Sequence, residues 1–190
     1  MDPSIGAHGT SQVHTASCLS CTNGIKAKQA MSEASVNDHE HLPLLGHSEL
    51  LANARKIVFG PTLEEEKTIA SIQTIAGTGA NHLGALLLAK ACRPHTVWIS
   101  NPSWINHHEI WTLADPSIRR QIYPYFSPRS FSIDFEGMVH TLRSSTIEGD
   151  VVLLHGCAHN PTGLDLSRDQ WRIIASVCEE KGLFPLFDLA

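Results

Sequence analysis

The chain has 190 residues, 42% of them hydrophobic, and a formal net charge of −5 at pH 7. This length is enough for one ordinary domain with a buried core and too short for two large domains. The acidic charge balance argues against a nucleic-acid-binding surface, and the longest apolar run, residues 83–91, is far shorter than the ~20 residues of a membrane span. We therefore expect neither nucleic acid nor a membrane among its partners.

The first 38 residues differ in composition from the rest of the chain. They are rich in Ser, Thr, Gly and Ala without a sustained apolar period, so residues 1–38 are predicted to be a poorly structured head. They contain no arginine, which argues against a mitochondrial presequence. The five cysteines are odd in number and scattered, a pattern typical of a reducing compartment, and we expect a cytoplasmic protein.

Cys18 and Cys21 form a C-x-x-C pair in this head, with His8 and His14 upstream. Cysteine and histidine are zinc ligands, but a structural zinc site normally requires a second pair at matching spacing, which the sequence lacks. No metal is therefore expected, and zinc binding by the head is kept as an alternative.

From residue 39 onward, segments with helical and strand patterns alternate. The clearest helix starts at a capping box, Ser167-x-x-Gln170, and stops at Gly182, and Gly60-Pro61 ends the first helix. This alternation predicts an α/β fold with a mostly parallel sheet and helices on both faces. Helices are predicted over residues 50–58, 80–92, 105–113, 134–143 and 167–182, and strands over residues 68–75, 96–100, 121–126, 151–154 and 184–187.

Ligands of such sheets bind at the carboxyl ends of the strands, so the loops after the predicted strands are the places to search. The loop at residues 76–80, Ala-Gly-Thr-Gly-Ala, opens a helix. Its N–H groups suit a phosphate, although glycine-rich turns of this kind are also common without a ligand. Trp104, after the next strand, is placed to stack on a planar ligand or to serve as a core aromatic.

Polar residues follow the last two predicted strands as well. Asn160, in the loop 155–163, offers an amide to a ligand oxygen, and the alternative is a plain Asn-Pro-x-Gly turn. The Asn160-Pro161 bond is a candidate for the cis form. Asp188 ends an apolar strand, and a carboxylate buried there requires a positive partner.

Four segments in this order resemble the aspartate aminotransferases, which are fold type I enzymes that use pyridoxal 5′-phosphate. The resemblance covers about residues 37–190. It implies that residues 39–190 are the N-terminal part of the cofactor-binding large domain, which is incomplete because it is truncated after the Asp188 strand. The segments are Ser-Ile-Gln-Thr-Ile-Ala-Gly-Thr-Gly-Ala (71–80), Trp-Ile-Ser-Asn-Pro-Ser-Trp-Ile-Asn-His-His (98–108), Leu-Leu-His-Gly-Cys-Ala-His-Asn-Pro-Thr-Gly (153–163) and Leu-Phe-Pro-Leu-Phe-Asp (183–188).

The resemblance assigns the cofactor's phosphate and ring to residues of the first two loops. Ala76, Gly77 and Thr78 would hold the phosphate at a helix N-terminus. Trp104 would stack on the pyridine ring. Both roles agree with the chemistry argued above for these loops.

The resemblance assigns the remaining polar residues to the edge of the same ring. Asn160 would hydrogen-bond to the ring hydroxyl oxygen, Asp188 would pair with the pyridine nitrogen, and His107 would orient Asp188. A protonated ring is the better electron sink for a carbanion at the amino acid α-carbon. The implied substrates are aspartate or glutamate and 2-oxo acids, and the implied assembly is a homodimer.

Two features depart from the family pattern. His41 stands where the family has a tyrosine that reaches the phosphate of the other subunit. The lysine that forms the Schiff base, in a Ser-x-Ser-Lys segment, is absent from the sequence, so no catalytic residue is assigned. We expect a truncated aminotransferase that is inactive alone. The alternative is a genuine short pseudoenzyme that acts as a binding or interaction module.

Overall fold

The computed structural model describes residues 20–33, 41–64 and 69–189. The chain divides into two compact units, Met1–Leu42 and Pro43–Ala190. In the first unit, α1 (Ser20–Glu33) is a helix, which differs from the prediction of a poorly structured head. Good helix formers such as Ala, Lys, Gln and Met dominate its second half, and Gln29 Nε2 donates to Glu33 Oε1 at 3.0 Å, one turn away. Cys21 lies in α1, whereas Cys18 and the rest of the head lie outside the described residues.

The second unit contains a four-stranded sheet in the order β2-β1-β5-β6, in which all neighbours pair in parallel. The predicted α/β fold is therefore confirmed. Its helices are α2 (Ser48–Glu64), α3 (Ala76–Ala91), α4 (Asn106–Ala114), α5 (Phe135–Ser145) and α6 (Arg168–Lys181), and its strands are β1 (Thr96–Asn101), β2 (Arg119–Pro124), β3 (Phe126–Ser127), β4 (Ser132–Ile133), β5 (Val151–Cys157) and β6 (Phe184–Leu189). β3 and β4 form a separate antiparallel pair.

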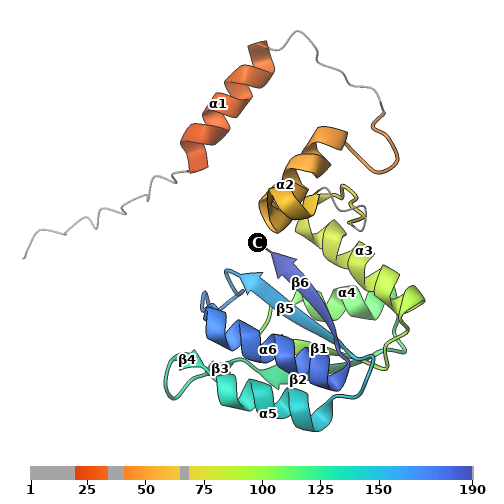
Figure 1. Ribbon diagram of the computed structural model, residues 1–190, viewed down its shortest axis with the longest axis vertical. Helices are drawn as coiled ribbons and strands as arrows, with labels where there is room; N and C mark the ends of the chain where they lie inside the picture. The colour runs from red at the N-terminus through yellow and green to blue at the C-terminus, as the bar shows by residue number, and fades with distance from the viewer. Residues whose placement is uncertain (1–19, 34–40, 65–68, 190) are drawn as a thin grey trace, which may run out of the picture. The chain divides into compact units, whose positions relative to one another are not determined.

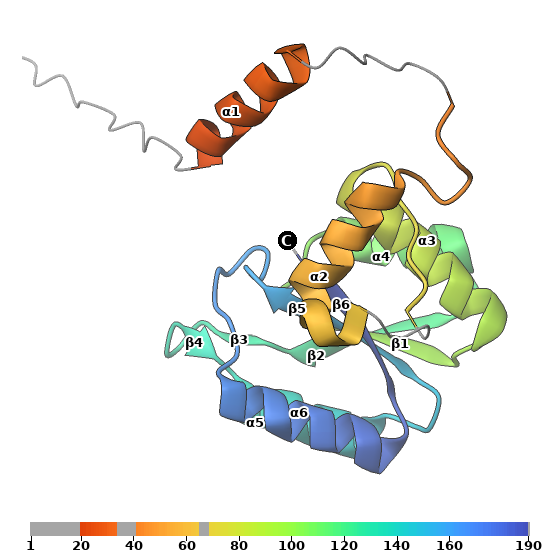
Figure 2. The ribbon, with the colours of Figure 1, turned by 45° about the horizontal axis from the view of Figure 1, so that its top comes forward.

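Helices cover both faces of the parallel sheet. Figures 1 and 2 show α5 and α6 together on one side and α3 and α4 on the other. Alternate residues of β5 pack on opposite faces of the sheet: Val152 and Leu154 belong to one core cluster, and Val151 and Leu153 belong to the other. These four side chains are at most 1% exposed. A strand buried on both faces has this continuous apolar sequence.

Capping residues fix where α6 begins and ends and where α5 begins. Ser167 accepts a hydrogen bond from Gln170 N, and the Gln170 side chain accepts from Ser167 N, so the predicted capping box is confirmed. Gly182 ends α6 with a φ of 64°, in the left-handed region that favours glycine. At the start of α5, Asp134 Oδ1 accepts from Gly137 N at 3.0 Å.

Two predicted strands differ from the structure. Residues 69–75 form no strand, and α3 begins at Ala76, four residues earlier than predicted. This segment bonds to the turn before α2, where Gln73 N donates to Leu45 O at 2.8 Å. Strand propensity depends on the strands that lie alongside a segment. Among the described residues, no strand of the sheet pairs with residues 69–75. The predicted strand 121–126 divides into the end of β2 and the start of β3.

Helix α2 keeps the predicted break at Gly60, whose φ of 77° lies outside the helical region. Its apolar side chains are more exposed than the helical pattern predicts: Leu50 is 50% exposed and Ile57 is 84% exposed. In the parts of the chain that the structure describes, every helix is too short or too polar to cross a membrane.

Candidate functional site

A cavity of about 190 Å³ lies where the carboxyl ends of β5 and β6 meet the start of α3 and the loop after β1. Four of the predicted site residues, each from a different segment of the chain, contribute to its lining. Ala76 and Thr78 flank Gly77 in the first turn of α3 rather than lining it, and His107 is hydrogen-bonded to Asp188. The lining residues are Gly77, Asn81, Trp104, His155, Cys157, Ala158, Asn160, Asp188 and Leu189.

The start of α3 has the properties of an anion site. Ile75, at the cap position, makes no side-chain cap hydrogen bond, so the cap gives the first-turn N–H groups of Ala76, Gly77 and Thr78 no acceptor. All three residues are exposed. A Cβ added at Gly77 would meet no atom within 4 Å, so the space beside it is open. An uncapped helix N-terminus beside open space suits a phosphate.

A carboxylate that lines the cavity is hydrogen-bonded to a buried imidazole behind it. Oδ2 of Asp188, on β6, lies 2.9 Å from Nε2 of His107, on α4. The His107 side chain is 0% exposed and that of Asp188 is 24% exposed. The hydrogen bond from His107 lowers the pKa of Asp188, while burial acts in the opposite direction. Asp188 is therefore anionic at neutral pH, and it lines the cavity.

Hydrogen bonds connect Asp188 to the loop that carries Asn160. The Asn160 N–H donates to His155 Nδ1 at 3.2 Å, and Ser103 Oγ lies 3.1 Å from His155 Nε2 and 2.9 Å from His107 Nδ1. Burial lowers the pKa of His155 to about 4, so this imidazole is neutral and, with Nδ1 accepting, its proton is on Nε2. Each following group must then donate onward, from His155 to Ser103, from Ser103 to His107 and from His107 to Asp188.

The two remaining predicted residues also reach the cavity. Trp104 is half-buried, and its ring meets the His107 ring edge-on, with centroids 5.2 Å apart at 89°. Asn160 is exposed at the cavity, and the Asn160-Pro161 peptide, a candidate for the cis form in the sequence, is cis. A stacking face and an amide therefore stand beside the carboxylate and the helix N-terminus.

Ser103 and Asn81 were not among the predicted site residues. Ser103 precedes the predicted Trp104 by one residue, and Asn81 follows the glycine-rich loop. Asn81 lines the cavity, and its side chain contributes to the lowered pKa of Asp188. The sequence signal for each residue is its closeness to a loop that was predicted to follow a strand.

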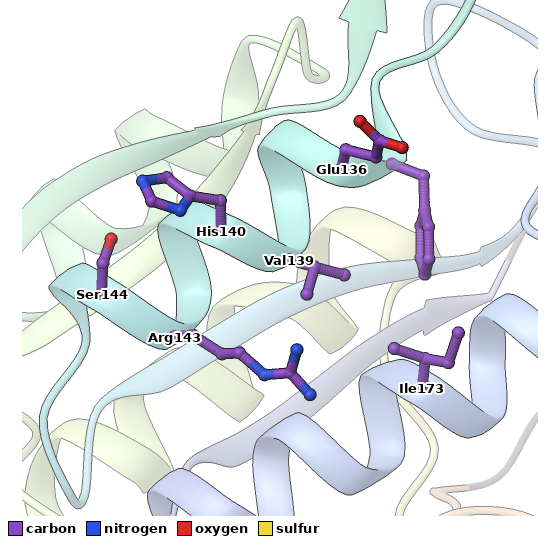
Figure 3. Close-up of a pocket in the computed structure, with 7 residues that line it drawn as sticks. Glu136, Val139, His140, Arg143, Ser144 and Ile173 are labelled. Atoms are coloured by element: carbon purple, nitrogen blue, oxygen red, sulfur yellow. The ribbon is translucent and has the colours of Figure 1, made fainter.

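A larger cavity lies away from the strand ends, between α5 and α6. Its volume is about 520 Å³, and Figure 3 shows Val139 and Arg143 of α5 and Ile173 of α6 around it. Arg143 Nε already lies 3.4 Å from Glu180 Oε2. None of the predicted site residues lines this cavity, so the smaller one at the strand ends is the candidate site.

Comparisons with known proteins place the chain in a family. The family described as aminotransferase class I and II matches residues 10–190. An L-tyrosine:2-oxoglutarate aminotransferase of Aspergillus ustus is 46% identical over 170 residues, which are 86% of this chain and 32% of that protein.

Two solved structures support the same assignment. The aspartate aminotransferase from Saccharomyces cerevisiae cytoplasm superposes with a TM-score of 0.80 at 32% identity, covering 87% of this chain and 40% of that one. The aromatic-amino-acid aminotransferase of Burkholderia pseudomallei, covalently bound to pyridoxal phosphate, superposes with a TM-score of 0.77 at 32% identity. The match covers 87% of this chain and 41% of that one. The chain thus spans less than half the length of these relatives, and it belongs to the class I and II aminotransferase family.

Proposed function

We propose that the chain supplies part of the pyridoxal 5′-phosphate site of an aminotransferase that moves an amino group between aspartate or glutamate and 2-oxo acids. One observation carries the proposal: an anionic carboxylate, Asp188, shares a cavity with the uncapped N-terminus of α3. Pyridoxal 5′-phosphate carries a phosphate and a ring nitrogen that accepts a proton, so it needs both an anion site and a carboxylate. The 190 Å³ cavity offers both.

At the phosphate end, the backbone N–H groups of Ala76, Gly77 and Thr78 would hold the anion, and the helix dipole would add to their attraction. Trp104 would cover one face of the ring, because its half-buried indole borders the cavity. These contacts bind and orient the cofactor without moving a proton.

At the ring nitrogen, Asp188 would accept a hydrogen bond from the protonated nitrogen and keep the proton there. His107 holds Asp188 anionic and fixes its direction through the 2.9 Å bond. Asn160 would donate its side-chain amide to the ring hydroxyl oxygen. Once bound, the cofactor supplies the electron sink for charge that develops at the amino acid α-carbon.

Among the described residues, the cavity lining contains neither lysine nor arginine. We therefore propose that this chain alone binds the cofactor reversibly and does not turn over substrate. An aromatic amino acid is the second candidate substrate, favoured by the 46% identity to the Aspergillus tyrosine enzyme. A cytoplasmic location and a homodimer complete the proposal. The yeast relative from the cytoplasm supports the location.

Ligand titration of the purified chain tests the proposal. Pyridoxal 5′-phosphate should quench tryptophan fluorescence with saturation, and pyridoxal, which lacks the phosphate, should bind about tenfold or more weakly. Equal binding of the two compounds would refute the phosphate role of the α3 start. Incubation with 2-oxoglutarate and either aspartate or tyrosine should give no product, and turnover of either would refute the proposed inactivity of the chain alone.

A further inference from the structure

His159 lies between the loop that carries Asn160 and the end of strand β1, and its side chain is 1% exposed. Its Nε2 atom is 3.0 Å from Ser100 Oγ, on β1, and its Nδ1 atom is 2.9 Å from Thr162 Oγ1, in the loop itself. Both ring nitrogens therefore have hydroxyl partners, one on the sheet and one on the loop.

Two aromatic rings hold the His159 ring from its two faces. The Tyr125 ring stacks on it with centroids 3.7 Å apart and planes 6° apart, and the His155 ring stacks at 4.2 Å and 28°. Tyr125 also donates from its hydroxyl to Leu164 O at 2.6 Å, which ties down the far end of the same loop. The imidazole is thus fixed in position and in rotation.

The backbone beside His159 needs such support. Ala158 has a φ of 50°, in the left-handed region that a non-glycine residue adopts only at a cost in free energy. Ala158 and Asn160 are both exposed at the cavity, so packing of their own side chains contributes little to holding this backbone. The buried residue between them, His159, is the one that anchors the turn.

We propose that His159 is a positioning residue: through Ser100 it fastens the loop to the end of β1 and so aims Asn160 into the cavity. This inference rests on the proposed function, in which Asn160 contacts the cofactor ring. It assigns the anchoring to the bond with Ser100, because the bond with Thr162 joins the loop only to itself. It also explains why a polar side chain occupies a site that is almost fully buried.

Two isosteric variants of the full 190-residue chain separate the two hydrogen bonds. In His159→Gln the amide nitrogen takes the place of Nε2 and keeps the bond to Ser100, whereas in His159→Asn it takes the place of Nδ1 and keeps only the bond to Thr162. The readout is amide hydrogen exchange at Asn160 N–H, which donates to His155 Nδ1, and at Gly163 N–H, which donates to His159 O. These measurements require no cofactor.

His159→Asn should accelerate exchange at both amides about tenfold, and His159→Gln should change it less than about threefold. Pyridoxal 5′-phosphate affinity should follow the same order. His140→Gln, on the exposed side of α5, is the matched control and should change neither quantity. If the His159 variants fail to fold, Ser100→Ala removes the same bond from the sheet side and should reproduce the effect of His159→Asn.

Equal exchange in His159→Gln and His159→Asn, or unchanged exchange at Asn160 in His159→Asn and Ser100→Ala, would overturn the anchoring role. Faster exchange with unchanged cofactor affinity would overturn the positioning role. If the unmodified chain binds no pyridoxal 5′-phosphate, the proposed function fails and the aiming toward a cofactor fails with it. The exchange rates still decide in that case whether His159 anchors the loop.

Discussion

His107 Nε2 lies 2.9 Å from Asp188 Oδ2, although the two residues are 81 positions apart in the sequence. The contact exists because α4 follows β1 and Asp188 ends β6, two strands away in the same parallel sheet. It keeps a charged carboxylate at the cavity wall without a cationic lysine or arginine beside it in the cavity lining that the structure describes. This arrangement leaves Asp188 free to accept a hydrogen bond from a ligand.

Replacing Asp188 by asparagine removes the charge and keeps the size of the side chain. Because a charge-assisted hydrogen bond is worth about 1.5–3 kcal/mol, Asp188→Asn should weaken pyridoxal 5′-phosphate binding about tenfold to a hundredfold. Fluorescence titration measures the affinity, and Asp169→Asn, on the exposed face of α6, is the matched control. Equal affinities for the two variants would contradict the role of Asp188 as the partner of the ring nitrogen.

The buried histidines make stability depend on pH. Burial lowers the pKa of His155 and of His159 to about 4, from an ordinary value of 6.5. Between these values the unfolded chain binds more protons than the folded chain, so the free energy of unfolding should fall as the pH decreases from about 6.5 to about 4. The lowered pKa of Asp188 adds a further loss only below its ordinary value of 3.8.

Urea unfolding at pH 7, 5.5 and 4.5 measures this dependence. Replacing His155 or His159 by glutamine should reduce the slope of unfolding free energy against pH, because one proton-binding site is then lost from the unfolded chain. A slope equal to that of the unmodified chain in both buried-site variants would show that other groups cause the dependence.

The parallel sheet and its helices could be predicted because their sequence signals come from residues that are close together in the chain. The apolar run at residues 151–154 has the composition of a strand buried on both faces, and the cap at Ser167 and the stop at Gly182 mark α6 by hydrogen bonds within a few residues. The start of α3 and the existence of α1 could not be predicted in this way, because α3 starts directly after a β-branched segment and α1 lacks an apolar period.

The site could be predicted only in part. The rule that ligands bind at the carboxyl ends of strands selected Gly77, Trp104, Asn160 and Asp188, which line one cavity. The bond between Ser103 and His155 joins residues 52 positions apart, and no spacing in the sequence indicates such a distance. Interactions of this kind depend on how the strands are ordered in space, which local patterns do not determine.

Asp150 is a second buried carboxylate, and its role is structural. It is 1% exposed and accepts hydrogen bonds from Thr96 N at 3.0 Å, Trp98 Nε1 at 2.9 Å and Ile147 N at 3.1 Å. Asp150→Ala leaves three donors, two of them buried, without this acceptor and should lower the free energy of unfolding by about 3 kcal/mol.

Urea unfolding followed by tryptophan fluorescence measures the loss at Asp150. Asp150→Asn keeps one acceptor oxygen and should fall between the unmodified chain and the alanine variant. Asp115→Ala is the control, because among the described residues that carboxylate accepts hydrogen bonds only from the exposed Ser117, and it should lower stability less than Asp150→Ala does. A similar loss in Asp150→Ala and Asp115→Ala would contradict the role of Asp150.

Ala158 offers a test of backbone strain at the site. Its φ of 50° is one that glycine adopts freely, so Ala158→Gly relieves strain in the folded chain while it adds conformational freedom to the unfolded chain. These effects oppose each other, and the free energy of unfolding should change by less than about 0.5 kcal/mol. Ala175→Gly, at an exposed position inside α6, has no strain to relieve and should cost about 1 kcal/mol. Parallel urea unfolding of the two variants measures the difference, and an equal loss in both would show that the backbone at Ala158 is not strained.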